Sequence, residues 1–493
     1  MLTRWGETLD KNNVLGEYPR PQMRRSSFIN LNGLWDYAFT AAGEKQPDKW
    51  DGKILVPFSP ESELSGVGRT LSPDEYLWYR RDWAKPDFGE GRVILHFGAV
   101  DQCCTVYING LRAYRHNGGY LPFEFDATGF LSKDVNELSL SVRDVSDTSY
   151  HSRGKQKLKR GGIWYTPQSG IWQTVWAECI PKDCVRSLRI TPDFDHACIN
   201  VRADIVGESK AYALFDGQQY PLPASIPVPD FEPWSPKNPK LYDFSVVCGE
   251  DRVESYFAMR KFSVEADENG VKRLFLNGKP YFHNGLLDQG YWSDGMYTAP
   301  SDEALIFDIQ TAKDMGFNML RKHIKVEPLR WYYHCDRYGM LVWQDMPNGG
   351  GKYNPVVISA PLVTGINLKD SAYGPLVTGV HLSDKNHKLF AREDLEGRIE
   401  YETELNEMIE LLYNCPCIAM WVPFNEGWGQ FDAARIAEKI ANADPTRTID
   451  HASGWHDQKI GETKSLHVYF KKYVFKPDKL GRAVMLTEFG GYN

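Results

Sequence analysis

The sequence lacks the features of a membrane-spanning, secreted or nucleic-acid-binding protein. Nowhere in its 493 residues do about 18 apolar residues run together, which is the length that a membrane-spanning helix requires. The segment 1–13, MLTRWGETLDKNN, does not contain the apolar core of a secretory signal. With 57 Lys and Arg against 65 Asp and Glu, the net charge of −8 offers no broad attraction for phosphate backbones. We therefore expect a soluble, cytoplasmic protein that has neither a membrane nor a nucleic acid as its partner.

The sequence also lacks a cysteine framework and the loops of several enzyme classes. Its 9 cysteines are sparse and odd in number, so they do not indicate a set of disulfides. Cys415 and Cys417 have no second pair of thiols beside them, which favours two buried cysteines over a zinc site. Neither a glycine-rich phosphate-binding loop nor a nucleophile-elbow motif occurs. Nothing in the sequence indicates a metal ion or a cofactor, and we predict none.

Aromatic residues, by contrast, are abundant. The 15 Trp, 26 Tyr and 24 Phe make up 13% of the chain. Large flat side chains fill the cores of β-sandwiches, and they also suit clefts that stack on sugar rings. The composition therefore indicates both a β-rich fold and a carbohydrate site without deciding between them.

The first half of the chain is predicted to form two β-sandwich domains. Up to about residue 182, short alternating apolar runs are separated by Gly, Pro, Asn and Asp, and no amphipathic helix lies between them. The pair Asn109-Gly110 is a strong turn signal in this region. Residues 183–262 continue the pattern over roughly the length of an immunoglobulin-like domain. We expect one sandwich in residues 1–182 and an immunoglobulin-like sandwich in residues 183–262.

Residues 263–493 change to an alternation of apolar strands and helical patterns. This alternation predicts a parallel sheet, either doubly wound or closed into a (β/α) barrel. Several strands end in polar or acidic residues, which is typical of the barrel. We find seven strands, the first at about residues 281–287, whereas a closed (β/α)8 barrel needs an eighth strand and more helix. We therefore expect an incomplete TIM barrel, the chain being a fragment or a truncated product with unpaired edges at its first and seventh strands.

A long polar, glycine-rich connection, residues 348–391, follows the third of these strands. It contains a local echo, PLVTG at residues 361–365 and again at residues 375–379. Connections beyond about 15 residues are usually functional or disordered. From its place in the chain it would overhang the carboxyl ends of the strands. We interpret it as a surface insertion, and a role in shaping the substrate site is the alternative.

Two glutamates that follow apolar strands carry the predicted chemistry. Glu426 lies in residues 421–430, WVPFNEGWGQ, where apolar surroundings favour the protonated carboxyl that a proton donor needs. Glu488 lies in residues 485–491, MLTEFGG. Taken singly, a glutamate at a strand end is more often a solvated charge. Two carboxylates at the mouth of one barrel, however, are what cleavage of a glycosidic bond requires, one to protonate the leaving oxygen and the other to attack the anomeric carbon.

These segments, with the two preceding β-domains, resemble glycoside hydrolase family 2, which contains β-galactosidases, β-glucuronidases and β-mannosidases. The resemblance extends over nearly the whole chain. Four short runs are similar to the jelly-roll sandwich of the sugar-binding type with which that family begins: residues 31–35 (LNGLW), 78–81 (WYRR), 161–164 (GGIW) and 169–172 (SGIW). Residues 277–280 (NGKP) are similar to the family's entry into the barrel. The resemblance implies a retaining mechanism in which Glu426 is the acid/base, Glu488 is the nucleophile and Asn425 hydrogen-bonds the sugar 2-hydroxyl.

Further positions are candidates for binding the terminal sugar. Five fall at or just after strand ends, where members of the family place such residues: His323, Asp345, Trp455, His467 and Tyr469. Trp455 could stack on a sugar face or fill the core, and the two histidines could donate to hydroxyls or be packed into a wall. Asn284 and Asp288, expected after the first strand, complete the set.

On this resemblance we predict an exo-acting, retaining β-glycosidase that removes a terminal sugar from a β-linked oligosaccharide or glycoside. A β-galactoside is the first candidate substrate. Residues 341–345 (LVWQD) are more similar to the mannosidase branch, so a β-mannoside and a β-glucuronide stay open. The alternative from another class is a carbohydrate-binding protein whose incomplete barrel is inert. Assembly into a homo-oligomer is also left open.

Overall fold

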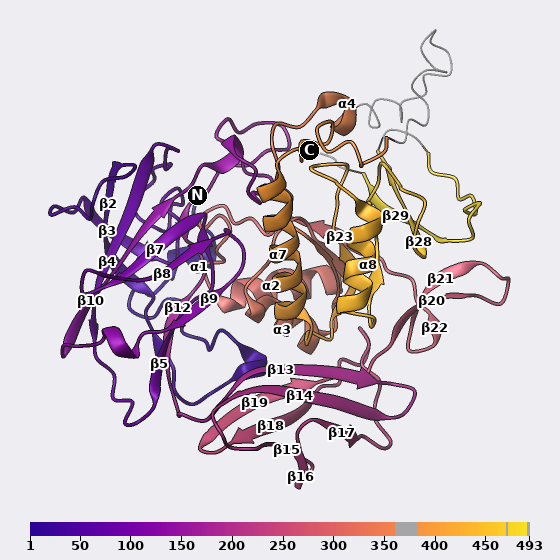
Figure 1. The fold of residues 1–493 in the computed structure, drawn as a ribbon. Helices are drawn as coiled ribbons and strands as arrows, with labels where there is room; N and C mark the ends of the chain where they lie inside the picture. The colour runs from indigo at the N-terminus through magenta and orange to yellow at the C-terminus, as the bar shows by residue number, and fades with distance from the viewer. Residues whose placement is uncertain (360–381, 470–471, 491–493) are drawn as a thin grey trace.

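The computed structural model describes residues 1–359, 382–469 and 472–490. Figure 1 shows an indigo and purple β-region, a magenta β-region beneath it, and an orange to yellow region of mixed helices and strands. None of the helices in these ranges combines the length and the apolar character needed to span a bilayer. The echoed segments 361–365 and 375–379 lie outside the described residues.

The amino-terminal region is built from antiparallel sheets. The six-stranded sheet has the order β3 (Gly52–Val56), β2 (Gly33–Ala41), β4 (Glu75–Ala84), β10 (Val135–Arg143), β7 (Cys103–Ile108) and β8 (Leu111–Asn117). The four-stranded sheet has the order β1 (Ile29–Asn30), β12 (Val175–Ile180), β5 (Arg92–Phe97) and β9 (Phe123–Asp126). Two short strands, β6 (Val100–Asp101) and β11 (Gly170–Ile171), pair with each other. The region also contains the short helix α1 (Arg4–Glu7) and the 3-10 turns η1 (Pro21–Met23), η2 (Thr128–Phe130) and η3 (Ser146–Thr148).

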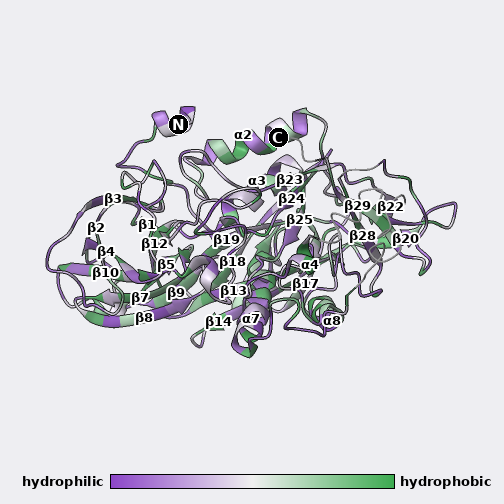
Figure 2. Cartoon of the chain, turned by 90° about the horizontal axis from the view of Figure 1, so that it is seen from above, coloured by the Kyte–Doolittle hydropathy of each residue, from purple (hydrophilic) through white to green (hydrophobic). Residues whose placement is uncertain are grey.

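Side-chain alternation explains why these segments are strands. In β7, Cys104, Val106 and Ile108 are buried, whereas the residues between them are only partly covered. Figure 2 shows apolar and polar residues following one another along strands of this region. The predicted turn at Asn109-Gly110 is confirmed, because both residues have positive φ, 52° and 76°, and join β7 to β8.

A second β-region follows, and it too has two sheets. One has the order β13 (Cys184–Asp193), β14 (Cys198–Val206) and β17 (Ala224–Pro227), and the other β16 (Gln218–Pro221), β15 (Ala211–Phe215), β18 (Tyr242–Cys248) and β19 (Asp251–Phe257). A separate small sheet then precedes the helical region: β20 (Phe262–Ala266), β21 (Lys272–Leu276) and β22 (Lys279–Pro280). Phe262, the last residue expected in the second sandwich, therefore begins this linking sheet.

The third region is a parallel (β/α) assembly. Five strands pair in chain order: β23 (Gly285–Asp288), β24 (Met319–Lys322), β25 (Leu341–Asp345), β26 (Ile418–Val422) and β27 (Thr448–Ile449). In the described part of these connections lie the helices α2 (Asp302–Asp314), α3 (Leu329–Tyr338), α7 (Leu395–Leu412) and α8 (Ala433–Ala443), and a short helix, α4 (Pro355–Ile358), follows β25. Two further strands, β28 (Thr463–Val468) and β29 (Ala483–Phe489), form a parallel pair. Because strand order follows chain order without reversal, the sheet has barrel rather than doubly wound topology.

The first strand of this region begins later than the sequence predicts. Tyr281 still belongs to the linking sheet, since its N–H donates to Leu274 O at 2.9 Å, and β23 starts only at Gly285. Asn284 therefore precedes the strand instead of following it. Within the described residues, β23 pairs only with β24, and β29 pairs only with β28.

Candidate active site

The turn after β26 fixes the backbone that carries Glu426. Asn425 forms an isolated parallel bridge with Ser453, and the Glu426 N–H donates to Ser453 O at 3.0 Å. Glu426 itself has φ 51° and Gly427 has φ 74°. A left-handed conformation at a residue other than glycine is unfavourable by about 1 kcal/mol or more, and such strain is concentrated at functional sites. The fold therefore holds Glu426 at one position at the carboxyl end of the strand.

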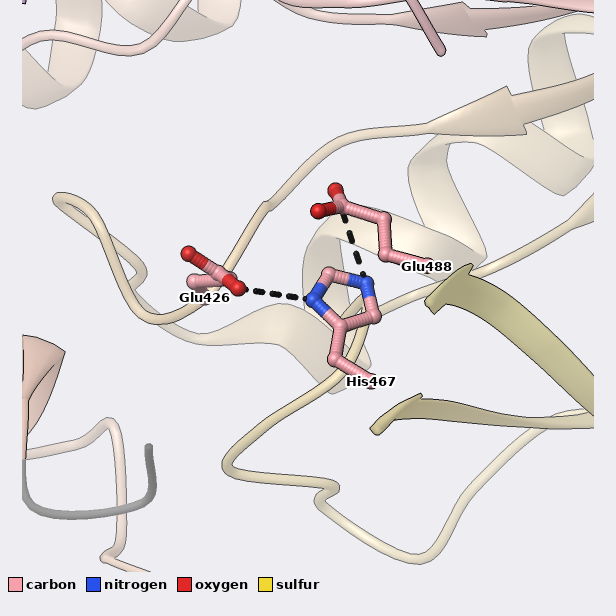
Figure 3. Close-up of side chains that lie close together, drawn as sticks. All are labelled: Glu426, His467 and Glu488. Atoms are coloured by element: carbon pink, nitrogen blue, oxygen red, sulfur yellow. Dashed lines mark hydrogen bonds and ion pairs between the residues drawn. The ribbon is translucent and has the colours of Figure 1, made fainter. Parts of the chain in front are cut away.

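His467 lies between the two glutamates (Figure 3). Its Nδ1 is 2.8 Å from Glu426 Oε1, and its Nε2 is 3.7 Å from Glu488 Oε1. One ligand-type atom from each of the three side chains lies within 4.8 Å of the others. The two carboxylates thus face one small space, although 62 residues separate them in the chain.

Tyr469 connects the same two carboxylates. Its hydroxyl is 2.9 Å from Glu426 Oε1 and 2.5 Å from Glu488 Oε2. Burial and the two nearby negative charges raise the pKa of the Tyr469 phenol far above its usual value, so the hydroxyl keeps its proton and can donate.

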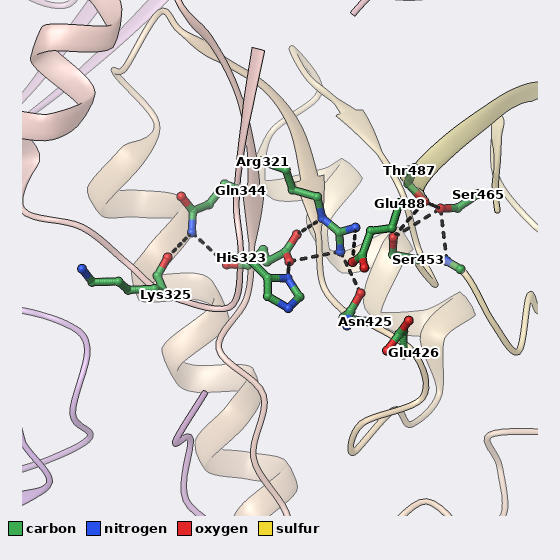
Figure 4. Close-up of polar contacts among 12 residues, drawn as sticks. Arg321, His323, Lys325, Gln344, Asn425, Glu426, Ser453, Ser465, Thr487 and Glu488 are labelled. Atoms are coloured by element: carbon green, nitrogen blue, oxygen red, sulfur yellow. Dashed lines mark hydrogen bonds and ion pairs between the residues drawn. The ribbon is translucent and has the colours of Figure 1, made fainter. Parts of the chain in front are cut away.

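Arg321 organises the opposite side of Glu488 (Figure 4). Its Nη1 donates to Glu488 Oε1 at 3.0 Å, and its Nη2 donates to Asn425 Oδ1 at 2.9 Å. Its Nε and Nη2 also donate to the two oxygens of Asp345, at 2.9 and 3.1 Å. A planar guanidinium suits this multiple contact, because its donors lie in a fixed fork. Arg321 is 1% exposed, so the contacts are made away from bulk water.

These contacts determine the charge of Glu488. Burial alone raises the pKa of its carboxyl, but the electrostatic influence of His467 and Arg321 outweighs burial and lowers the pKa to about 2. Glu488 is therefore ionised at neutral pH, which is the form that a nucleophile needs.

His323, Asp345 and Trp455 lie in the same cluster. His323 Nδ1 is 2.8 Å from Asp345 Oδ2, and burial lowers the pKa of His323 well below its usual value. The ring of Trp455 lies 6.2 Å from that of His467, centroid to centroid. The structure thus gathers eight of the predicted site residues: His323, Asp345, Asn425, Glu426, Trp455, His467, Tyr469 and Glu488.

The structure does not bring Asn284 or Asp288 to this cluster. Asn284 is at the amino end of β23, where its side chain donates to Gly316 O at 3.3 Å. Asp288 does lie at the carboxyl end of β23, but it pairs with Lys322 at 2.8 Å. Lys322 also binds Glu327 at 2.8 Å, so Asp288 belongs to a neighbouring charged group.

Sequence reasoning missed three residues that the structure places at the site. Arg321 lies in β24, and its spacing from His323 is a usable signal, since residues i and i+2 of a strand point to the same face. Ser453, whose Oγ is 3.1 Å from His467 Nε2, had no such signal. Lys155 comes from the amino-terminal region, and the charges of Glu488 and Glu426 act on it.

Glu426, His467 and Glu488 are also the described group that could hold a metal ion. The guanidinium of Arg321, 3.0 Å from Glu488 Oε1, opposes a second positive charge there. The Tyr469 hydroxyl already uses the other oxygen of Glu488. The donors present therefore suit hydrogen-bonded carboxylates better than cation ligands.

Two family models match the chain. Residues 69–176 match the family 2 glycosyl hydrolase sugar binding domain, and residues 269–483 match the family 2 glycosyl hydrolase TIM barrel domain. Together they cover well over half of the chain, and the second contains Arg321, Glu426 and His467.

Curated relatives are much longer than the region that matches. A β-galactosidase of Psychromonas ingrahamii is 26% identical over 438 residues, which are 81% of this chain but 37% of the relative. A β-galactosidase of Leuconostoc mesenteroides is 24% identical over 395 residues, 73% of this chain and 34% of the relative. The chain thus spans little more than a third of the length of these proteins.

Solved structures share the fold at low identity. An uncultured Clostridium β-glucuronidase has a TM-score of 0.74 and 19% identity, covering 95% of this chain and 84% of that one. A β-galacturonidase from Eisenbergiella tayi has a TM-score of 0.71 and 18% identity, covering 96% of this chain and 82% of that one. These likenesses show a shared fold, and the matches to both domain models show that the chain belongs to family 2 of the glycosyl hydrolases.

Proposed function

We propose that this protein is a retaining β-glycosidase that hydrolyses terminal β-linked sugars. The observation that carries the proposal is the close approach of Glu426 and Glu488, which place one carboxylate oxygen each within 4.8 Å of the other. A retaining enzyme needs carboxyl groups only about 5 to 5.5 Å apart, whereas an inverting enzyme leaves room for water between them.

The surroundings of the two glutamates support different roles. Glu488 is ionised by its neighbours, above all by Arg321 and His467, so it is the group that attacks the anomeric carbon and forms a glycosyl-enzyme. Glu426 faces it and shares Tyr469 with it. Glu426 first donates a proton to the leaving oxygen and then, as a carboxylate, activates the water that releases the sugar.

Asn425 and Arg321 set the position of the sugar in this proposal. The Asn425 side-chain oxygen is occupied by Arg321, which leaves its buried Nδ2 without a partner among the described residues. A buried, unpaired donor is costly, and a sugar hydroxyl is the partner that the proposed reaction supplies. A β-galactoside is the first substrate that we propose, because the curated relatives compared above carry the name β-galactosidase.

A covalent trap tests the proposal. A 2-fluoro β-galactoside with a good leaving group should add one glycosyl mass to the intact protein, and peptide mapping should place it on Glu488. The Glu488→Gln variant is the matched control and should stay unlabelled. The mannoside and glucuronide versions extend the test to other sugars. No label from any of the three would favour a sugar-binding protein without turnover.

A further inference from the structure

One group near the carboxylates has no role in the proposed mechanism. Lys155 lies on the segment between β10 and β11, residues 144–169, which we call the arm. The arm belongs to the amino-terminal region in sequence but extends to the carboxyl ends of the barrel strands. The Lys155 Nζ lies 5.8 Å from the centre of the Trp428 ring, two residues beyond Glu426.

The arm is held firmly against the barrel. The N–H groups of Arg153 and Gly154, directly before Lys155, both donate to Asn348 O, at 2.9 and 3.1 Å. From further along the arm, the Tyr165 N–H donates to Lys155 O at 2.9 Å. The position of Lys155 is therefore set by backbone contacts on both sides.

Side chains of the arm add further contacts to the barrel. His151 Nδ1 is 2.6 Å from Glu400 Oε1, and Ser152 Oγ donates to Glu404. The Tyr291 hydroxyl donates to Thr166 O at 2.7 Å. These contacts come from helix α7 and from the loop after β23, so the arm is fixed at both of its ends.

The Lys155 ammonium, in contrast, has an aromatic ring as its neighbour and has no polar partner among the described residues. Within the described ranges it makes neither a hydrogen bond nor an ion pair, although the side chain is partly buried. Burial lowers its pKa, and the charges of Glu488 and Glu426 oppose that shift. A partly desolvated, unpaired ammonium is unfavourable by itself, and such groups are concentrated at functional sites.

Aromatic rings form a wall beside this ammonium. Trp428 is 3% exposed, and its ring lies 5.3 Å from that of Trp164 and 6.4 Å from that of Tyr353. Trp164 is itself a residue of the arm. The arm thus places one cation and one aromatic ring beside Trp428, two residues beyond Glu426.

We propose that Lys155 is a specificity-determining residue that binds a carboxylate on the substrate. This inference rests on the proposed glycosidase function and names the substrate class for it: a glycoside that carries a negative charge near the cleaved bond. The two catalytic carboxylates repel such a charge, so an acidic substrate needs a cation at the site. Arg321 is already engaged by Asp345, Glu488 and Asn425, whereas Lys155 is not.

The carboxylate could lie on the sugar that is removed or on the leaving group, and substrates distinguish the two. A nitrophenyl β-glucuronide and β-galacturonide carry it on the sugar, and an umbelliferyl β-galactoside with a carboxyl group on the coumarin carries it on the leaving group. Their uncharged counterparts are, in the same order, the nitrophenyl β-glucoside, the nitrophenyl β-galactoside and the methylumbelliferyl β-galactoside. The quantity to compare is the ratio of kcat/KM for the charged substrate to that for its uncharged counterpart.

For one of the two positions of the carboxylate, on the sugar or on the leaving group, we expect a preference for the charged substrate. This preference should fall by about 10- to 100-fold in Lys155→Gln, mainly through KM, because a hydrogen bond to a charged group is worth a factor of this size. Lys155→Arg should keep most of the preference. The matched control is Lys159→Gln, which removes an exposed lysine of the same arm and should leave the ratio unchanged.

Failure of this inference can be told apart from failure of the proposed function. If the protein hydrolyses glycosides and is labelled at Glu488, but Lys155→Gln changes charged and uncharged substrates equally, the function stands and the inference is overturned. Calorimetry with Glu488→Gln tests binding without turnover. If Glu488→Gln binds the charged substrate more tightly than its uncharged counterpart, and the double variant Glu488→Gln/Lys155→Gln loses this difference, the inference is supported. If Glu488→Gln binds both substrates equally, the inference is contradicted.

Discussion

At the scale of single residues, the site depends on which groups donate to the two carboxylates. Arg321 and Tyr469 approach Glu488 from opposite sides, and His467 and Tyr469 both approach Glu426. This arrangement keeps Glu488 ionised. It also holds the two carboxyl groups close together, because the donors lie between and beside them. The Tyr469 hydroxyl lies within hydrogen-bond distance of both carboxylates.

Replacing Tyr469 with phenylalanine tests what its hydroxyl contributes to the rate and to the pKa of Glu488. In Tyr469→Phe we expect kcat to fall by about 10- to 100-fold, since hydrogen bonds to charged groups contribute about 1.5 to 3 kcal/mol. Loss of a donor to the carboxylate raises the pKa of Glu488 from about 2, so the acid limb of kcat/KM against pH should move to higher pH. Tyr473→Phe, on the same segment, is the control. An unchanged acid limb would show that Tyr469 does not act on Glu488.

At the scale of the element, the turn after β26 decides whether Glu426 reaches its place. A Cβ on Gly427 would lie 2.7 Å from His456 Cδ2 and 2.9 Å from Val357 Cγ1, and both of these side chains are buried. The residue also has φ 74°, where only glycine is relaxed. The turn thus combines a left-handed backbone with tight packing.

We expect Gly427→Ala to lower stability by about 3 kcal/mol and to reduce activity sharply, because overpacking adds about 1 to 3 kcal/mol to the backbone term. Gly481→Ala is a matched control, since Gly481 has nearly the same φ, 71°, but nothing within 4 Å of its added Cβ. It should lose about 1 kcal/mol and keep its activity. Thermal unfolding measures the loss of stability, and kcat measures the loss of activity. Equal losses of stability in Gly427→Ala and Gly481→Ala would contradict the packing argument.

Elements with a local signal were predictable from the sequence. The turn at Asn109-Gly110 is encoded in two residues, and apolar runs mark β26, which ends four residues before Glu426, and β29, in which Glu488 is the last residue but one. Asn284 was misplaced because the linking sheet extends to Tyr281, a pairing with Leu274 that no local pattern reveals. The boundary of a strand depends on its partners, which the periodicity of one segment does not contain.

At the scale of the whole molecule, the site is made by more than one region of the chain. No property of residues 144–169 taken alone indicates that Lys155 lies near Glu426, since the approach depends on how the sandwich docks on the barrel. The same docking buries Glu404 of α7 against Ser152 of the arm. Burial raises the pKa of the Glu404 carboxyl to about 7, so this contact couples the docking to pH.

The sign of that coupling follows from linkage. A carboxyl whose pKa is higher in the folded state than in the unfolded state binds its proton more tightly when folded. Its contribution to stability is complete below the unfolded pKa of about 4.3 and is lost as the pH rises through about 7. We therefore expect the protein to be less stable at pH 8 than at pH 5, with Glu404 accounting for up to about 3 kcal/mol of the difference.

Glu404→Gln should reduce this difference, because an uncharged amide has no proton to lose between pH 5 and pH 8. The measurement is the unfolding temperature of both proteins at the two pH values. Glu402→Gln is the control on the same helix: hydrogen bonding to Arg435 lowers the pKa of Glu402, so its titration falls below this pH range and the difference should persist. If Glu404→Gln and the unmodified protein lose the same stability between pH 5 and pH 8, the buried contact between α7 and the arm does not carry the pH dependence.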